Sequence, residues 1–378
     1  MDDLHKSTKA IQAGKATHQE VRPVAMPIYL SSTYERKADG SYHNNYVYSR
    51  NDNPNRQLLE QSMAELEGGA VAYAFSSGMA AISAVLQSLS TGDHILLADD
   101  VYFKVRTLLD DVYNRWGLSY SLVDMTDLDA VAAAIGPHTR MLWLESPSNP
   151  MLKITDIEAV TTLTREYNCL TVVDNTWATP ILMNPIQLGA DIVVHSTTKY
   201  IGGHSDVLGG AVVCGVADDT AQRVADIQVA MGAVPSPFDC WLVSRGVQTL
   251  PLRVAAQSSA AMKLAEYLAG HDQVEVVHYP GLTTHAGHSI AASQMSDYGA
   301  MLSVQIVGGQ SAALAVCNAL QLFTQATSLG GVESLVEHRQ SVEGPSSSTP
   351  PSLLRLSVGL EHAEDLISDF AQALQSLA

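Results

Sequence analysis

Between residues 70 and 214, short apolar runs alternate with segments whose apolar residues recur at helical spacing. The runs lie at residues 70–75, 94–98, 141–145, 170–174, 191–195 and 210–214. Each is only five or six residues long and mostly apolar, which is typical of strands buried on both faces. Buried strands separated by helices predict an α/β fold, with a mostly parallel sheet covered by helices on both sides.

Helical patterns fit between these runs. Apolar positions predict a helix over 57–67 that stops at Gly68 and Gly69, a second over 79–89, and a third that begins after Asp156. From about residue 244 the pattern changes to a long helical stretch, strands at 301–307 and 353–358, and a closing amphipathic helix at 363–377. We expect this second part to be a smaller α+β domain.

A chain of 378 residues is long for a single core and favours a division into domains. Residues 1–57 are polar, are interrupted by prolines and are predicted to be irregular. The predicted organisation is therefore an N-terminal arm over 1–57, a large domain over 58–243 and a C-terminal domain over 244–378.

Composition excludes several classes of protein. The formal net charge of −18 would repel the phosphate backbone of a nucleic acid. The sequence has no apolar run of about 18 residues, which would span a membrane, and the polar residues 1–14 do not lead us to expect a secretory signal. The four cysteines form no CxxC pair, so we expect buried free thiols and neither a zinc site nor a disulfide framework. A cytoplasmic protein is the expectation.

Three segments at predicted strand ends could carry chemistry. Ser77, Gly78 and Met79 lie between a strand and a helix, where backbone N–H groups and the helix dipole can bind an anion. Asp174 ends the strand at 170–174, where a carboxylate must be paired. Lys199 follows three hydroxyl residues, and burial there would make it a nucleophile. Individually, an ordinary turn explains the first segment better, and a helix cap or salt-bridge partner and a surface lysine explain the other two equally well.

Together the three segments supply what pyridoxal 5'-phosphate (PLP) needs. The phosphate requires N–H and O–H donors, the pyridine nitrogen a carboxylate, and the aldehyde an amine. The glycine spacing of dinucleotide- and nucleotide-binding loops is missing, which counts against a Rossmann enzyme.

Motifs in order along nearly the whole chain resemble the Cys/Met-metabolism family of PLP enzymes, which includes cystathionine γ-synthases, γ- and β-lyases, methionine γ-lyases and homoserine sulfhydrylases. The matching segments are residues 27–33, 48–50, 77–81, 145–150, 173–176, 196–200, 203–206, 328–335 and 354–359. The resemblance implies a fold-type-I, aspartate aminotransferase-like architecture with a seven-stranded sheet. It also implies a homotetramer, a dimer of dimers with shared active sites.

The same resemblance implies roles for individual residues. Lys199 would form the Schiff base with the cofactor and move protons, Asp174 would pair with the pyridine nitrogen, and Tyr102 would stack on the ring and assist catalysis. The remaining cofactor contacts would be Gly78, Met79, Asn149, Ser196 and Thr198, with Tyr48 and Arg50 from a neighbouring subunit. On the substrate side would lie Arg355, which would take the α-carboxylate, together with Ser328 and Thr327.

The chain departs from the family pattern near the substrate. Phe103 and Lys104 stand where the family usually has glycines, and Thr327 stands where synthases and γ-lyases commonly carry Glu. The segment 343–351 lacks the family's longer stretch with a histidine. The missing carboxylate at Thr327 weakens the case for a substrate with a distal ammonium group.

These features predict elimination or replacement at the γ carbon of a sulfur-type amino acid or an activated homoserine. His204, Ser205 and Asp206 favour the cystathionine branch, whereas residues 175–178 resemble β-lyases. Alternatives are therefore a cystathionine β-lyase, or a γ-lyase with another leaving group. A PLP-binding regulatory protein without catalysis is the rival from a different class.

Overall fold

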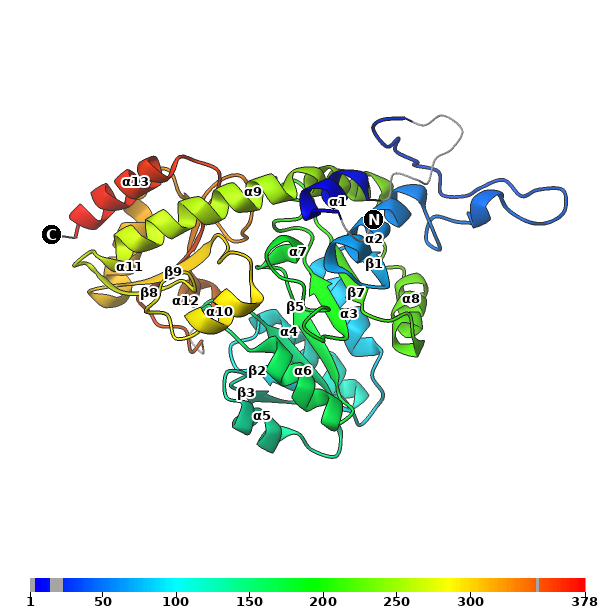
Figure 1. Ribbon diagram of the computed structural model, residues 1–378, viewed down its shortest axis with the longest axis horizontal. Coiled ribbons are helices and arrows are strands. Elements are labelled where there is room, and N and C mark those ends of the chain that lie inside the picture. Colours follow the sequence, from blue (N-terminus) through cyan, green and yellow to red (C-terminus); the bar gives the residue numbers. More distant parts are fainter. Residues whose placement is uncertain (1–3, 14–22, 345–346, 378) are drawn as a thin grey trace.

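The computed structural model describes residues 4–13, 23–344 and 347–377. It contains a seven-stranded sheet and a five-stranded sheet, and the long helix α9 (Pro237–Ala269) runs along one side of both. In Figure 1 the seven-stranded sheet lies below the middle of α9, and the five-stranded sheet lies under its C-terminal half. None of the described helices is long and apolar enough to span a bilayer.

The larger sheet has the strand order β1-β7-β6-β5-β4-β2-β3. Its strands are β1 (Val71–Phe75), β2 (His94–Ala98), β3 (Ser119–Val123), β4 (Thr139–Glu145), β5 (Leu170–Asp174), β6 (Ile192–His195) and β7 (Gly210–Cys214). β2 to β6 pair in parallel, and only β7 runs antiparallel to both of its neighbours. The prediction of a mostly parallel seven-stranded sheet is confirmed.

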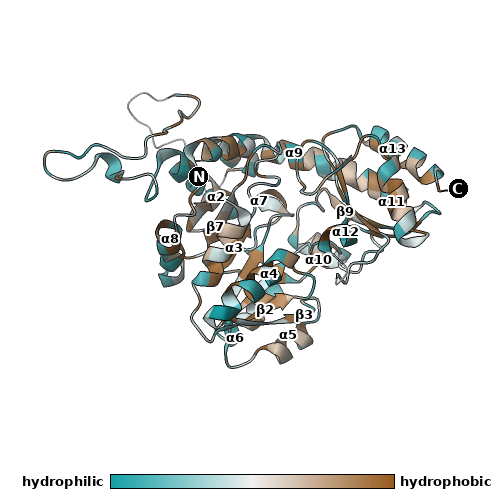
Figure 2. Ribbon diagram, turned by 180° about the vertical axis from the view of Figure 1, so that it is seen from behind, coloured by the Kyte–Doolittle hydropathy of each residue, from teal (hydrophilic) through white to brown (hydrophobic). Residues whose placement is uncertain are grey.

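Helices cover both faces of this sheet. Every side chain of β6 and β7 is buried although successive side chains point to opposite faces, so neither face is open to water. Figure 2 shows apolar strands at the centre and hydrophilic residues on α4 and α6 outside them. The helices are α2 (Pro54–Glu67), α3 (Gly78–Gln87), α4 (Phe103–Asp111), η3 (Tyr113–Trp116), α5 (Leu128–Ala134), α6 (Ile157–Glu166), α7 (Thr179–Leu182) and α8 (Asp219–Met231).

The smaller sheet has the order β10-β11-β12-β9-β8. Its strands are β8 (Val274–His278), β9 (Met301–Ile306), β10 (Thr324–Gln325), β11 (Leu335–His338) and β12 (Leu353–Ser357). The accompanying helices are α10 (His288–Gln294), α11 (Gly309–Ala319), α12 (Arg339–Glu343) and α13 (Ala363–Gln375). The expected domain boundary at residue 244 falls inside α9, because Ser236 caps this helix and Pro237 starts it.

The N-terminal part differs from the predicted irregular arm. A helix, α1 (Lys6–Gln12), packs against α9, and α2 begins at Pro54 because the Asn53 side chain accepts a hydrogen bond from the backbone of Asn55. Between them, residues 23–53 project from the body and contain only the short helix η2 (His43–Asn45). The remainder of the predicted arm, residues 1–3 and 14–22, lies outside the described residues.

The four cysteines are free and buried, as the sequence predicted. In the segment 343–351, Glu343 ends α12, and residues 344 and 347–351 form neither helix nor strand. Residues 345–346 lie outside the described part of the chain.

Candidate active site

A cavity of about 400 Å³ lies at the carboxyl ends of β4, β5 and β6, where open parallel sheets bind their ligands. Asp174, Ser196 and Lys199 reach it from the larger sheet. Ser328 and Arg355 reach it from the region of the smaller sheet. The cavity therefore brings together residues more than 150 positions apart in the sequence.

One wall of the cavity is the N-terminal turn of α3. The Ser77 hydroxyl caps the helix by accepting a hydrogen bond from the backbone of Ala80 at 3.1 Å, which leaves the N–H groups of Gly78 and Met79 without helical partners. A Cβ on Gly78 would lie 2.9 Å from the Ser196 Cβ, so glycine is required at this position. Thr198 faces the same space, and its hydroxyl bonds to the backbone of Gly209. This wall is a cradle of donors suited to a phosphate.

Two carboxyl groups lie side by side at the bottom of the cavity. Asp174 accepts a hydrogen bond from the Thr176 backbone at 3.0 Å, and Glu145 accepts one from the Tyr102 backbone at 2.9 Å. The two residues pair across β4 and β5. Burial raises the pKa of Asp174, while burial and the charge of Asp174 raise the pKa of Glu145 well above its usual value. A cation beside Asp174 would relieve this unfavourable burial.

Lys199 lies just beyond β6 and donates a hydrogen bond to the Ser328 hydroxyl at 2.7 Å. Burial, followed by the nearby Arg355 charge, lowers the pKa of Lys199 to about 8. An amine with this pKa is often neutral near physiological pH and can attack an aldehyde. Ser328 has a φ of +98°, a strained conformation for a residue with a side chain, of the kind that clusters at functional sites.

Arg355 is buried and donates to Asn149 Oδ1 at 3.1 Å, to the Ser328 carbonyl at 3.2 Å and to Glu337 Oε2 at 2.6 Å. Burial is the main reason that its pKa falls to about 10. Glu337 also accepts from Arg339, another residue that lines the cavity, at 2.6 Å. Neither Glu337 nor Arg339 was identified from the sequence, because no motif marks them and only the pairing of β11 with β12 brings them to Arg355.

The residues that depart from the family pattern lie around the same cavity. Tyr102 lines it, and burial raises the pKa of its hydroxyl. The Phe103 ring packs edge-on against Tyr102 at 5.3 Å, and the Lys104 ammonium lies 4.8 Å from the centre of the Phe103 ring. Thr327 lines the cavity as well. The unusual side chains Phe103, Lys104 and Thr327 therefore all line the cavity.

Tyr48 and Arg50 do not line the cavity of their own chain. Both lie on the projecting stretch of residues 23–53, where Tyr48 is 45% exposed and Arg50 donates to the Val229 carbonyl at 2.8 Å. Their expected role across a subunit boundary stays a prediction.

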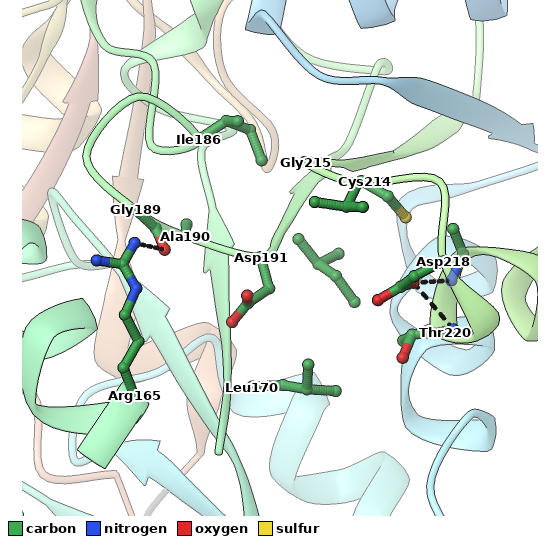
Figure 3. A pocket seen from close by; sticks show the side chains of 13 residues that line it. Arg165, Leu170, Ile186, Gly189, Ala190, Asp191, Cys214, Gly215, Asp218 and Thr220 are labelled. Carbon is green, nitrogen blue, oxygen red and sulfur yellow. Dashed lines mark hydrogen bonds between the residues drawn. The ribbon is translucent and has the colours of Figure 1, made fainter. Parts of the chain in front are cut away.

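A second cavity, of about 230 Å³, opens at the opposite end of β5 and β6 (Figure 3). Its polar groups already have partners: Asp218 caps α8, Arg165 donates to the Gly189 carbonyl, and Asp191 accepts from the Thr171 backbone. Among the residues that the structure describes, no lysine lines this cavity, so they offer no amine to an aldehyde cofactor.

The first cavity fits PLP on its own chemistry. A donor cradle, a buried carboxyl group that needs a cation, and a lysine with a lowered pKa face one space large enough for a small ligand. Comparisons with known proteins agree, since the model of the Cys/Met metabolism PLP-dependent enzymes matches residues 7–375. The chain belongs to this family. It is a PLP-dependent enzyme of fold type I, as the sequence predicted.

Relatives with different names are similarly close to this chain. It is 46% identical to a cystathionine gamma-synthase of Mycobacterium tuberculosis, over 97% of this chain and 96% of the relative. It is 45% identical to a cystathionine beta-lyase of Lactococcus lactis, over 97% and 98%. A solved cystathionine gamma-lyase of Lactobacillus plantarum, complexed with L-serine, superposes with a TM-score of 0.93 at 37% identity and covers 99% of each chain.

Proposed function

We propose that this enzyme eliminates or replaces the γ substituent of a sulfur-type amino acid or an activated homoserine. The observation that carries the proposal is the position of Lys199, which shares one cavity with the cradle at Gly78, the carboxyl group of Asp174 and the guanidinium of Arg355. Such a site can hold an amino acid by its carboxylate while a lysine acts as base beside it. The names of the relatives, which include synthases and lyases, support this range of reactions.

The residues have distinct tasks in this proposal. PLP, when bound, withdraws electrons from the substrate and so weakens the bonds at the α carbon. Gly78, Met79, Ser196 and Thr198 would hold its phosphate, Asn149 would contact the ring oxygen, and Asp174 would keep the ring nitrogen protonated. Lys199 would hold the aldehyde until substrate arrives. Its freed amine would then take the α proton and return protons to neighbouring carbons.

Arg355 would bind the substrate α-carboxylate. Its planar fork can form two parallel hydrogen bonds with a carboxylate, and its present partners, Asn149, Ser328 and Glu337, hold it in one orientation. Tyr102 would cover the ring and assist proton transfer to the leaving group. Ser328 and Thr327 would line the space that the γ substituent occupies.

A cystathionine β-lyase is the second candidate, because the β-lyase of Lactococcus lactis is as similar to this chain as the γ-synthase is. The two reactions differ in whether the base must also remove a β proton. A γ-lyase acting on another leaving group is a further option, since Thr327 offers no carboxylate to a distal ammonium group.

The proposed assembly is a cytoplasmic homotetramer, a dimer of dimers. The support is the projecting stretch of residues 23–53 (Figure 1), which exposes Leu30 and Tyr48. Neither Tyr48 nor Arg50 on this stretch lines the cavity of its own chain. In a dimer, Tyr48 and Arg50 would complete the phosphate site of the adjacent subunit.

A substrate panel tests the function. Purified enzyme with PLP is incubated with cystathionine, methionine, O-acetyl-homoserine and O-succinyl-homoserine, each with and without cysteine, and the products are identified by mass spectrometry. We expect γ products: 2-oxobutyrate when no thiol is added, or cystathionine from an O-acyl-homoserine and cysteine. Release of pyruvate and homocysteine from cystathionine, with no γ product, would favour the β-lyase instead.

A further inference from the structure

A buried carboxylate outside the cavity joins the ends of β5 and β6. Glu67 Oε1 lies 2.5 Å from His195 Nε2 and accepts a hydrogen bond from Asn175 Nδ2 at 2.8 Å. Glu67 Oε2 accepts from Asn184 Nδ2 at 3.2 Å. Glu67, His195 and Asn175 are all fully buried. We call these three residues the strand-end cluster.

The strand-end cluster lies on the face of the sheet opposite to the cofactor cavity. Asp174 and Thr176 line the cavity, but Asn175 between them does not. Ser196 lines the cavity as well, whereas the adjacent His195 does not. Because successive side chains of an extended strand point to opposite faces, each residue of the cluster on a strand is next to one that faces the cofactor.

The position of Glu67 is fixed by the end of α2. Glu67 is the last residue of this helix, and Gly68 follows with a left-handed φ of +74°. A Cβ on Gly69 would lie 2.4 Å from the Val213 Cγ1, so the chain can only turn here with glycine. The glycine pair therefore brings the helix end against the sheet and directs the Glu67 carboxylate beneath β5 and β6.

The buried charge of Glu67 makes its partners important for stability. A fully buried carboxylate is costly unless hydrogen bonds and an opposite charge compensate it. Glu67 has three nitrogen partners, from the ends of β5 and β6 and from the loop after α7, and the nearby Lys6 of α1, which donates to the Ile181 carbonyl, adds a positive charge. Removal of one partner would leave an unpaired buried group, for which the protein would compensate by moving the strand ends.

We propose that Glu67 and His195 are positioning residues that hold the ends of β5 and β6 so that Asp174 and Ser196 face the cofactor in the correct register. The inference rests on the cofactor site proposed above. A merely structural pair would stabilise the fold without affecting PLP. A positioning pair raises the affinity for PLP as well, because Asp174 would pair with the ring nitrogen and Ser196 would hold the phosphate, each at the end of a different strand.

Cofactor affinity of the apoprotein tests the proposal. PLP is removed, and the dissociation constant is measured by visible absorbance for wild type, His195→Ala, His195→Gln and Glu67→Gln, with the melting temperature of each apoprotein in parallel. Glutamine can place its Nε2 near that of histidine and keep the hydrogen bond to Glu67, whereas alanine cannot. Glu65→Gln on the same helix is the control, since Glu65 lies outside the cluster.

We expect the PLP dissociation constant to rise about 10-fold or more in His195→Ala and Glu67→Gln, because each variant loses one charge-assisted hydrogen bond of the cluster. It should stay within about 3-fold of wild type in His195→Gln, a difference of about 0.65 kcal/mol. The proposal is overturned if His195→Ala melts at a lower temperature but binds PLP with the affinity of wild type. It is also overturned if His195→Ala and His195→Gln lower the affinity for PLP equally. Should Glu67→Gln fail to fold, the two variants of His195 still distinguish a positioning role from a merely structural one. Failure of the proposed cofactor site would instead appear in wild type, as PLP that binds without attachment to Lys199.

Discussion

Lys199 of the apoprotein is expected to lose its proton with a midpoint near pH 8, because burial lowers its pKa to about 8. The charge of Arg355 contributes in the same direction, whereas the charge of Glu337 opposes it. The perturbation is therefore a change of pH, applied first to wild type and then to Glu337→Gln. Removal of the Glu337 charge should lower the midpoint further.

The size of the effect follows from the two pKa values. At pH 8 an ordinary lysine with a pKa of 10.5 is neutral for about 0.3% of the time, whereas half of the Lys199 side chains are neutral. Lys199 should therefore present about 150 times more free amine than an unperturbed lysine at this pH. The advantage shrinks to about twofold at pH 10.5, where nearly all Lys199 side chains and half of the ordinary lysines are neutral.

Competitive labelling measures this directly. Apoprotein is treated at a series of pH values with a trace amount of an amine-reactive reagent, and labelling at each lysine is quantified by peptide mass spectrometry. Lys104 is an internal control, because it borders the same cavity but is exposed to solvent. A labelling midpoint for Lys199 at or above pH 10 would refute the electrostatic account of the site.

Three substitutions test other parts of the site. Asp174→Asn should lower kcat about 100-fold, the usual cost of removing one preorganised electrostatic partner, in steady-state assays at saturating PLP; unchanged kcat would remove Asp174 from the mechanism. Thr327→Glu should raise kcat/KM for cystathionine about 5-fold relative to O-acetyl-homoserine, the value of a rim ion pair near 1 kcal/mol; an unchanged ratio would mean that residue 327 does not select the substrate. Glu337→Gln should lower the free energy of unfolding of the apoprotein by about 3 kcal/mol in denaturant titrations, because two buried arginines lose their shared carboxylate; a loss below about 1 kcal/mol would contradict this.

The sequence predicted the buried parts of the fold best. Strands at 94–98, 170–174 and 210–214 were placed at their observed bounds, since a strand buried on both faces needs a continuous apolar run. β3 (Ser119–Val123) was missed because it is an edge strand whose side chains are exposed or half-buried, and its two serines interrupt any continuous apolar run. α1 was missed for a similar reason: a seven-residue polar helix has no strong pattern of its own and is stabilised by packing against α9.

The candidate site likewise contains residues that the sequence could predict and residues that it could not. Gly78, Asp174 and Lys199 could be found because each ends or follows a predicted strand, and the carboxyl ends of parallel strands meet at one edge of a sheet. Glu337 and Arg339 could not, because their approach to Arg355 depends on the register between β11 and β12. The contacts of Glu67 could not be predicted either, because the sequence around a glutamate at a helix end does not show which strands that glutamate will contact.

Attachment of the cofactor to Lys199 is the central claim, and one measurement tests it most directly. The holoenzyme is reduced with sodium borohydride, digested, and searched by mass spectrometry for the lysine that carries the reduced pyridoxyl phosphate. The account predicts a single modified peptide containing Lys199, and none in Lys199→Ala. Modification of another lysine, or an unmodified Lys199 in protein saturated with PLP, would contradict it.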